Sequence, residues 1–261
     1  MSRAPFRPDP HRDRIVVLSG AGLSARAGLG VFRGEDGLWS RHPEVQDAME
    51  ASRLPQSLPL LWELWGGLAR TAIEHGPTPG HLAIARMGTR VITQNVDGLH
   101  QAAGSSEVAE LHGSALRAVC LGPDCSWSAP LTPGDGERAE DHGVPARCPR
   151  CGAPSRPDVV LFDEMLPEQE LDRGLRWSQD CDVFVAVGTS GAVAPAAMLA
   201  PRARHHGAVS VLIDIDPPAE AYLSGDFDHV IARDAHEVLP EWERGGRAGG
   251  AADFLDPFAR A

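Results

Sequence analysis

The chain has 261 residues, enough for one large domain or a large domain that carries a small insert, and with 43% hydrophobic and 23% charged residues its composition is typical of a soluble globular protein. Its formal net charge of −12 argues against a nucleic-acid partner, because proteins that bind nucleic-acid backbones concentrate Lys and Arg. No apolar run approaches the roughly 20 residues of a membrane span. Residues 1–12 are rich in Pro and Arg and carry no apolar signal segment, so a cytoplasmic protein without a membrane partner is expected.

Four apolar runs are predicted to be strands: "RIVVLSGAG" (residues 14–22), "RVITQN" (90–95), "DVFVAVGTS" (182–190) and "VSVLIDID" (209–216). Each run is continuous rather than alternating, which is typical of strands buried on both faces of a parallel sheet. The segments 59–76 and 194–207 are predicted to be crossover helices. The order predicts an α/β fold with a doubly wound parallel sheet, in which active sites gather at the carboxyl ends of the strands.

A glycine-containing stretch, "SGAGLSARAGLGVFRGEDGLW", follows the first predicted strand. Gly20 and Gly22 suit a close backbone approach to a pyrophosphate, although the full GxGxxG pattern is absent. Arg33 offers a fork of donors for phosphate or ribose, and Trp39 could close the loop over a ligand. A tight turn between strand and helix with a surface arginine is the alternative interpretation.

The second predicted strand ends in "TQNVDGLH", which places Gln94, Asn95 and Asp97 together. A turn needs only one or two such residues, so the stretch is interpreted either as a plain turn or as a grip on a ligand. His112, in "ELHGS", follows soon after and taken alone fits a surface or capping histidine. His100 is interpreted as a residue that only packs or caps.

Four cysteines fall into two close pairs, Cys120-x4-Cys125 and Cys148-x2-Cys151. Two such pairs can supply four thiolates to a tetrahedral zinc ion, and with every position taken by sulfur the metal is expected to be structural. The segment between the pairs has few apolar residues to hold it together, which disfavours incidental free cysteines. Cys181 is interpreted as a small buried apolar residue.

These motifs, with "RPDVVLFDEMLP" and "VGTSGAVAPAA", occur in an order that resembles the sirtuins, the NAD-dependent protein lysine deacylases, from about residue 14 to residue 240. The resemblance implies a Rossmann-type NAD domain with an inserted zinc-binding small domain. The expected divisions are a flexible N-terminus (1–12), the NAD domain (13–115 and 158–242), the small domain (116–157, with a helical part within 40–80) and a weakly ordered tail (243–261).

The resemblance also implies roles for individual residues. His112 matches the general base, and Asn95 and Asp97 complete the catalytic set. The NAD site is expected to contain Gly20, Ala21, Gly22, Ser24, Phe32, Arg33, Trp39, Gln94, Asn95, Asp97, Gly188, Thr189, Ser190, Asp216 and Ala235. Contacts to an acyl-lysine peptide are expected from Phe32, His112, Val159, Val160 and Phe162.

The implied reaction expels nicotinamide, joins the acyl oxygen to the anomeric carbon, and ends in free lysine and O-acyl-ADP-ribose. An ADP-ribosyltransferase or NAD hydrolase built on the same site, and a non-catalytic NAD-binding module, are the alternatives. Trp65 and Leu68 replace the Tyr and Arg of sirtuins that remove succinyl groups, so simple acyl groups are expected. Asp163 replaces a usual glycine beside the substrate strand, and Asp216 replaces a usual Asn.

Overall fold

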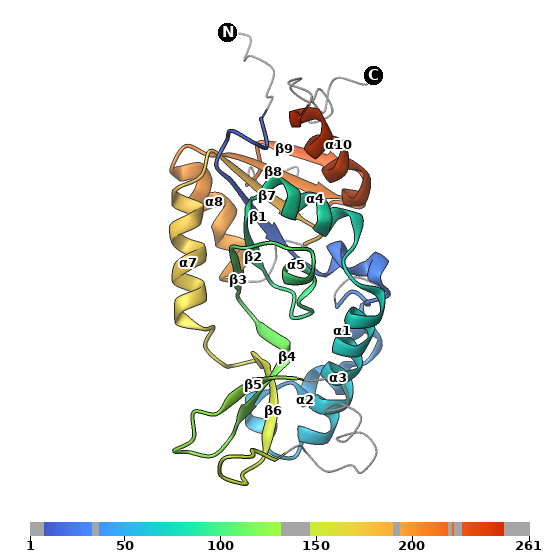
Figure 1. Ribbon diagram of the computed structural model, residues 1–261, viewed down its shortest axis with the longest axis vertical. Coiled ribbons are helices and arrows are strands. Elements are labelled where there is room, and N and C mark those ends of the chain that lie inside the picture. Colours follow the sequence, from blue (N-terminus) through green and yellow to red (C-terminus); the bar gives the residue numbers. More distant parts are fainter. Residues whose placement is uncertain are drawn as a thin grey trace.

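The computed structural model describes residues 8–32, 37–131, 147–189, 194–218, 221 and 226–247. Two sheets of different kinds organise these residues, a larger parallel sheet and a smaller antiparallel one (Figure 1). The larger sheet lies toward one end of the molecule, and the smaller sheet lies at the opposite end. Among the described residues, no helix combines the length and hydrophobicity that crossing a membrane would require.

The larger sheet has six strands in the order β3-β2-β1-β7-β8-β9, and all its pairs are parallel. Its strands are β1 (Ile15–Ser19), β2 (Arg90–Thr93), β3 (Val108–Glu110), β7 (Val183–Val187), β8 (Val209–Asp214) and β9 (His229–Ala232). The four predicted strands are thus confirmed as β1, β2, β7 and β8. Every residue of β1 and β7 is buried, which explains why these runs show no polar alternation.

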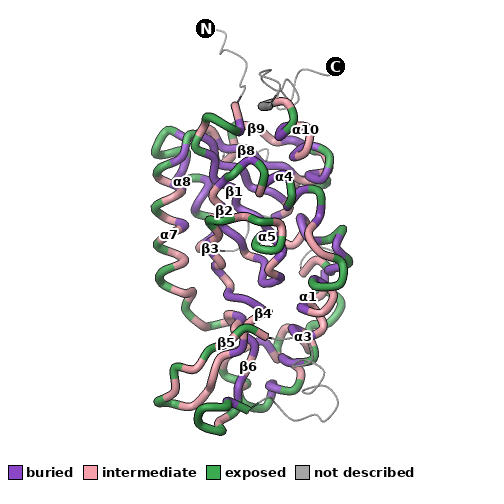
Figure 2. Tube along the Cα trace, in the orientation of Figure 1, coloured by how far each residue is buried: buried purple, intermediate pink, exposed green. Residues whose placement is uncertain are grey.

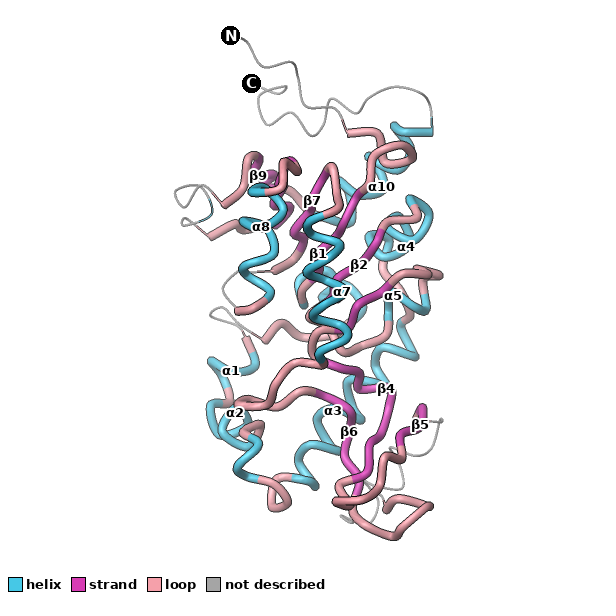
Figure 3. The backbone as a smooth tube through the Cα atoms, turned by 90° about the vertical axis from the view of Figure 1, so that its left-hand side faces the viewer, coloured by secondary structure: helices cyan, strands magenta, loops and turns pink. Residues whose placement is uncertain are grey.

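Helices cover both faces of this sheet, as the doubly wound prediction requires (Figures 1 and 3). On one face, α4 (Pro79–Met87) and α10 (Ala235–Arg247) pack over Val17 and Val185. The other face is covered by α7 (Glu168–Gln179) and α8 (Leu199–His205), with the short helix η4 (Ala196–Met198) before α8. Figure 2 shows the burial concentrated along the strands between these layers.

The smaller sheet pairs β4 (Gly113–Cys120) with β5 (Ser128–Pro130) and β6 (Ser155–Val159), all antiparallel. Helices α1 (Leu38–Arg41), α2 (Pro43–Ala48) and α3 (Leu58–His75) lie at the same end of the molecule (Figure 1). The remaining short elements are η1 (Ala21–Leu23), η2 (Ala25–Ala27), η3 (Ala51–Arg53) and α5 (Leu99–Ala102).

Helix α3 corrects one prediction, because it is not a crossover helix on the parallel sheet. Its buried face, which includes Leu61 and Trp65, packs against Ala115 of β4 and Val159 of β6. The Trp62 indole N–H donates to the Ser155 carbonyl oxygen at 2.9 Å and fastens the helix to β6. The segment therefore packs with the smaller sheet.

The tail prediction also needs correction, because α10 continues to Arg247 instead of ending before Glu243. Trp242 is fully buried, and its indole N–H donates to the Pro8 carbonyl oxygen at 3.0 Å. Glu243 is also buried and lies 3.4 Å from the Arg86 guanidinium. These contacts give the last helical turns tertiary support and hold residues 8–12, which were expected to be flexible, against the body of the protein. Residues 1–7 and 248–261 lie outside the described part.

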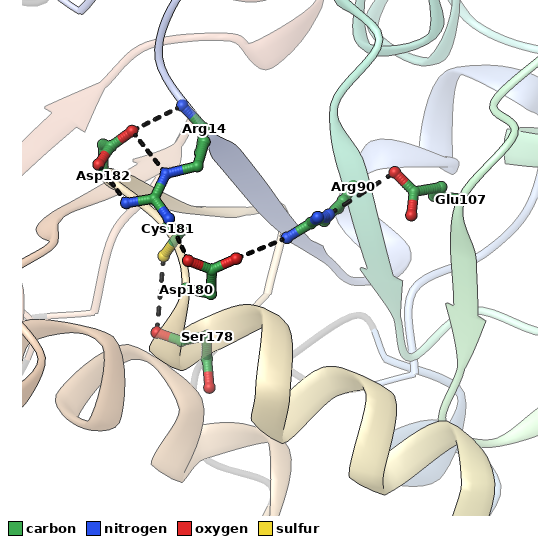
Figure 4. A network of polar contacts seen from close by, with 7 residues as sticks. All are labelled: Arg14, Arg90, Glu107, Ser178, Asp180, Cys181 and Asp182. Carbon is green, nitrogen blue, oxygen red and sulfur yellow. Dashed lines mark hydrogen bonds and ion pairs between the residues drawn. The ribbon is translucent and has the colours of Figure 1, made fainter.

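Ion pairs join the amino ends of the central strands (Figure 4). The Arg14 guanidinium, just before β1, contacts Asp182 at 2.8 Å and also Asp180, which lies 3.5 Å from Arg90. These pairs are partly exposed, so each contributes little stability. Cys181 is buried beside them, as predicted, and its thiol donates to the Ser178 carbonyl oxygen. Burial raises the pKa of this thiol to about 12.

Candidate active site

The strand order makes the carboxyl ends of β1 and β7 a topological switch point, where a crevice for a ligand is expected. From β1 the sheet extends through β2 to one side, and from β7 it extends through β8 to the other. Such a switch point leaves the two following loops splayed apart and is the usual ligand site of an open α/β sheet. The Gly20 N–H donates to the Val187 carbonyl oxygen at 3.0 Å and the Gly22 N–H to the Gly188 carbonyl oxygen at 2.9 Å, so the two loops touch at their bases.

Glycine is required where these loops cross. A Cβ atom on Gly20 would lie 2.6 Å from the Gly188 carbonyl oxygen, and one on Gly22 would lie 2.8 Å from the Gly188 Cα. Gly188 itself has a φ of +57°, a conformation that favours glycine. The three predicted glycines therefore meet each other, and their most direct role is to let two backbones approach closely.

Asn95 and Asp97 follow the carboxyl end of β2, are buried, and are bonded to the loop after β1. The Asn95 Nδ2 donates to the Gly20 carbonyl oxygen and to the Ser24 Oγ, both at 3.0 Å. Ser24 donates in turn to the Asp97 Oδ2 at 2.6 Å, and the Leu99 N–H donates to the Asp97 Oδ1 at 2.9 Å. A plain turn would not need these links between distant segments.

The Asp97 carboxyl group is 5% exposed and has no cationic partner among its described contacts. Burial raises its pKa above the usual value, although the hydrogen bonds from Ser24 and Leu99 partly oppose that rise. A buried carboxylate costs free energy and gains most from further hydroxyl or amide donors. The group is suited to bind a ligand rich in hydroxyl groups.

A contact with a backbone carbonyl oxygen determines which ring nitrogen of His112 carries the proton. Its Nδ1 lies 2.9 Å from the Gln94 carbonyl oxygen, which can only accept, so Nδ1 carries the proton in the neutral ring. The lone pair is then on Nε2, as a general base requires. The Gln94 side chain donates to the Thr189 Oγ1 at 2.8 Å, which joins the loop after β2 to the loop after β7.

The predicted substrate residues border His112 on the side of the smaller sheet. Val159 pairs with Gly113, and the Val160 N–H donates to the His112 carbonyl oxygen at 3.0 Å. The Phe162 N–H donates to the Met49 carbonyl oxygen at 2.9 Å, so the chain after β6 runs between His112 and the helical segment.

Four aromatic rings form an apolar wall beside this chain. Phe32 lies 5.3 Å from Trp39 and 5.8 Å from Trp65, and Trp39 lies 6.0 Å from Phe162, measured between ring centroids. The rings come from four separate segments and belong to one buried cluster that also contains Val159. This arrangement can enclose an apolar group next to His112.

The four paired cysteines meet in space. Their sulfur atoms all lie within 4.8 Å of one another, with Cys120 and Cys151 at 3.4 Å and Cys125 and Cys148 at 3.7 Å. A tetrahedral zinc with bonds of about 2.3 Å separates its sulfur ligands by about 3.8 Å, so the cluster fits one zinc ion. Gly113, which follows His112, pairs with Val159 of β6, and Cys120 pairs with Ser155, so the cysteine cluster lies roughly 13 Å along the sheet from Gly113 at about 3.3 Å per residue.

The geometry is shared with a known family. A family model described as the Sir2 family matches residues 20–195, more than half of the chain. The chain belongs to the Sir2 family.

Individual Sir2 relatives match over most of their length. The NAD-dependent protein deacylase of Pyrococcus furiosus is 38% identical over 231 residues, which cover 87% of this chain and 90% of the relative. The NAD-dependent protein deacylase 1 of Pseudomonas aeruginosa is 37% identical over 239 residues, which cover 87% and 92%. The crystal structure of a Sir2 homolog–NAD complex has a TM-score of 0.79 at 32% identity and covers 92% of both chains.

Not every residue that the Sir2 resemblance suggests lies at the crevice mouth. Asp216 is exposed in the turn after β8, where its N–H bonds to Asp214, and Ala235 starts α10 and packs into the core. Ala21 opens η1 between the two glycines and is half-buried. Arg33 and Ser190 lie outside the described residues.

Asp163, the residue that departs from the family pattern, has a φ of +69°. This left-handed conformation favours glycine, and Asp is one of the few other residues that adopt it. The backbone therefore explains why glycine is usual here and how an exposed Asp can replace it.

Sequence reasoning missed Ser19 and Thr93, the last residues of β1 and β2. Both are buried, and the Ser19 hydroxyl donates to the Thr93 Oγ1 at 2.8 Å. The available signal was a hydroxyl residue at the carboxyl end of each apolar run. Behind them lie His81 and His100, whose ring centroids are 4.6 Å apart.

Both histidines are buried in the neutral form. Burial, with smaller effects from His100 and His236, lowers the pKa of His81 to about 2, and burial lowers that of His100 to about 3. An unfolded histidine has a pKa near 6.5, so the folded state keeps its full stability above that pH and loses it as the pH falls toward the folded values.

We therefore expect the free energy of unfolding to fall by about 1.4 kcal/mol per pH unit for each of these histidines below pH ~6.5. Urea unfolding at pH 7.5 and pH 5.5 measures the difference. A His100→Gln variant should lose about half of this acid sensitivity, whereas His206→Gln, at an exposed position, should retain it. Equal acid sensitivity in all three proteins would contradict the assignment.

Proposed function

We propose that the protein removes acyl groups from protein lysines with NAD as co-substrate, giving nicotinamide and O-acyl-ADP-ribose. The observation that carries this is the contact between the His112 Nδ1 and the Gln94 carbonyl oxygen, which assigns the role of base to Nε2 and ties His112 to the segment that contains the buried Asn95 and Asp97. The names of the Sir2 relatives, which are NAD-dependent protein deacylases, support the same reaction.

The polar groups of the crevice fit NAD. Asn95 offers amide and carbonyl groups and Asp97 a carboxylate to the nicotinamide ribose and carboxamide, while Ser24 keeps both side chains in place. The loops of Gly20, Ala21 and Gly22 and of Gly188 and Thr189 face the switch point, where phosphates and adenosine are expected. Orienting the anomeric carbon and excluding water favour loss of nicotinamide.

The acyl oxygen of the substrate then attacks the anomeric carbon and forms an O-alkylamidate. His112 takes a proton from a ribose hydroxyl through Nε2, and the resulting alkoxide attacks the amidate carbon. Hydrolysis of that intermediate releases lysine and O-acyl-ADP-ribose. The zinc ion takes no part, because its four positions are filled by cysteine sulfur and the cluster lies far from His112.

The acyl-lysine is proposed to pass between the chain around Val160 and the aromatic wall. Extended backbone at Val159 and Val160 can pair with a substrate peptide in the manner of an added strand. Phe32 and Phe162 are proposed to border the acyl-lysine there, since both pack against the apolar cluster that contains Val159.

We expect acetyl-lysine peptides to be turned over at least ~10-fold faster than succinyl-lysine peptides, because burying a carboxylate without a counter-charge is costly. Trp65 is buried and Leu68 half-buried in the aromatic cluster, so neither position supplies a cation. Nicotinamide release with matched peptides measures the ratio. The double variant Trp65→Tyr with Leu68→Arg should lower the ratio of acetyl-lysine to succinyl-lysine turnover. Faster turnover of the succinyl peptide by the unaltered protein would contradict the proposal and would implicate Arg70 in binding the succinyl carboxylate.

The division proposed is the one expected from the sequence, an NAD domain (13–115 and 158–242) and a zinc-binding small domain (116–157) with a helical part within 40–80, and the packing of α3 against β4 and β6 supports that helical part. A cytoplasmic location is proposed because the zinc ligands must remain reduced thiols. The acidic net charge favours protein substrates over nucleic acid as partners.

A further inference from the structure

A chain of hydrogen bonds runs behind the NAD crevice. The Thr93 Oγ1 accepts from the Asn95 N–H at 3.0 Å and from the Ser19 hydroxyl at 2.8 Å. The Ser19 Oγ lies 2.8 Å from the His100 Nε2. Ser19, Thr93 and His100 are each at most 3% exposed, so water does not compete for these bonds.

The donors in this chain fix the form of His100. Since Ser19 gives its only proton to Thr93, its oxygen must accept from His100, and the proton of that ring is on Nε2. The Nδ1 of His100 is then a lone pair, and it is buried without a hydrogen-bond partner among the described residues.

The neighbouring ring of His81 offers a hydrogen-bond donor for this lone pair. His81, in the first turn of α4, accepts the Thr78 N–H at its Nδ1, as part of the capping box that begins this helix. Its proton is therefore on Nε2, which is also buried and unpartnered in the described part of the chain. With ring centroids 4.6 Å apart, donor and acceptor are close enough to share one hydrogen bond, directly or through one buried water.

We propose that His100 is a positioning residue for NAD binding, which through Ser19 and Thr93 fixes the backbone of Asn95 at the mouth of the crevice. The chain of donors leads in one direction, from His81 at the start of α4 to Thr93. The backbone N–H of Asn95 is bonded to this chain, and its side-chain amide is bonded to Gly20 and Ser24. This role rests on the proposed function, in which Asn95 binds the nicotinamide ribose.

Simple packing would make different demands on residue 100. A residue that only fills space can be replaced by an apolar side chain of similar size with little loss of ligand affinity. A residue that donates to Ser19 needs a polar atom at the place of Nε2, which the amide nitrogen of Gln can supply. Comparing His100→Leu with His100→Gln therefore separates the two roles.

The test is calorimetric titration of each variant with NAD alone, followed by steady-state kinetics with an acetyl-lysine peptide. For His100→Leu we expect the dissociation constant and the KM for NAD to rise about tenfold, which is the loss of about one hydrogen bond, while kcat at saturating NAD changes less than the KM. His100→Gln should recover most of this affinity. Ser19→Ala, a much smaller change, should weaken NAD binding in the same direction.

Phe184→Leu serves as the control for lowered stability, because Phe184 is fully buried in β7 on the face covered by α8 and is not in the hydrogen-bond chain. It should lower the melting temperature without changing the affinity for NAD. The proposal is overturned if His100→Leu binds NAD as tightly as this control, or if His100→Gln binds no better than His100→Leu. Should His100→Leu fail to fold, Ser19→Ala takes its place, and unchanged NAD affinity in that variant overturns the proposal.

The proposed function fails in a different way. An unaltered protein that binds NAD but does not consume it with any acyl-lysine peptide refutes the deacylase proposal, while the titrations still decide the role of His100. An unaltered protein that does not bind NAD refutes both.

Discussion

His112→Ala is expected to lower kcat of the NAD-dependent reaction by about 10²- to 10⁴-fold, the usual contribution of a general base, and to leave the affinity for NAD within about threefold. The structure gives the reason, since the ring is bonded through Nδ1 to the Gln94 carbonyl oxygen and presents Nε2 as the base. Asn95 and Asp97, which are proposed to hold the ribose, are fastened by Ser24 and Gly20 and do not depend on the His112 side chain.

Initial rates at saturating NAD and peptide, with calorimetric NAD binding, measure both quantities. His206→Ala, an exposed histidine at the end of α8, is the matched control and should behave like the unaltered protein. Turnover by His112→Ala within a few-fold of normal would show that another group is the base. A parallel loss of NAD binding would show that His112 holds the co-substrate.

Cys148→Ala is expected to remove the zinc ion and to unfold the smaller sheet, so that the protein aggregates or loses its cooperative melting transition. The apolar cluster at the zinc end of this sheet, formed by Trp62, Ala118, Trp127 and Leu131, is small, because the larger cluster with α3 contacts the other end through Ala115 and Val159. Binding of a structural zinc contributes about 10–16 kcal/mol in small zinc modules, so such a core cannot replace it. Zinc content by mass spectrometry and thermal melting measure the outcome.

Cys181→Ala is the control, because Cys181 is also buried but lies at the amino edge of the parallel sheet. This variant should keep one zinc per chain and lose only about 1 kcal/mol of stability. A Cys148→Ala protein that is soluble, free of zinc and active would refute the structural role of the metal.

The parallel sheet could be predicted from sequence because continuous apolar runs are the direct consequence of burial on both faces. Val17 and Val185 face α4 and α10, while Val16 and Phe184 face the opposite layer, so these strands are apolar on both faces until their carboxyl ends. The pairing of the cysteines was equally predictable, since two short loops with fixed spacing suffice to bring four sulfur atoms together.

The packing partner of α3 could not be predicted from the apolar pattern alone, although the family resemblance implied a helical part of the small domain within 40–80. The periodicity of Leu61, Trp65 and Ala69 indicates a buried face but does not say which sheet covers it. The end of α10 could not be predicted from its local sequence either. Its last turns, which include Glu243, are supported by the hydrogen bond from Trp242 to Pro8, and Pro8 lies more than 230 residues earlier in the chain. Contacts between segments so distant in the chain leave no local pattern.

Some residues of the candidate site could likewise be predicted from the sequence, and others could not. The residue types of Asn95, Asp97 and His112 indicate their chemistry, and they lie near one another because parallel strands end at one edge. Ser19, Thr93 and His100 were missed or taken as packing residues, since a hydroxyl at a strand end and a histidine in a short helix are ordinary features. Only their positions in space show that they form one hydrogen-bond chain to Asn95.

The central claim is tested most directly by the mass of the co-product formed when the protein is incubated with NAD and an acetyl-lysine peptide. Capture of the acyl group by the ribose predicts O-acetyl-ADP-ribose in equal amount to free nicotinamide and to deacetylated peptide. Plain ADP-ribose released equally with and without peptide, or ADP-ribose attached to protein, would contradict the deacylase mechanism and favour an NAD hydrolase or an ADP-ribosyltransferase.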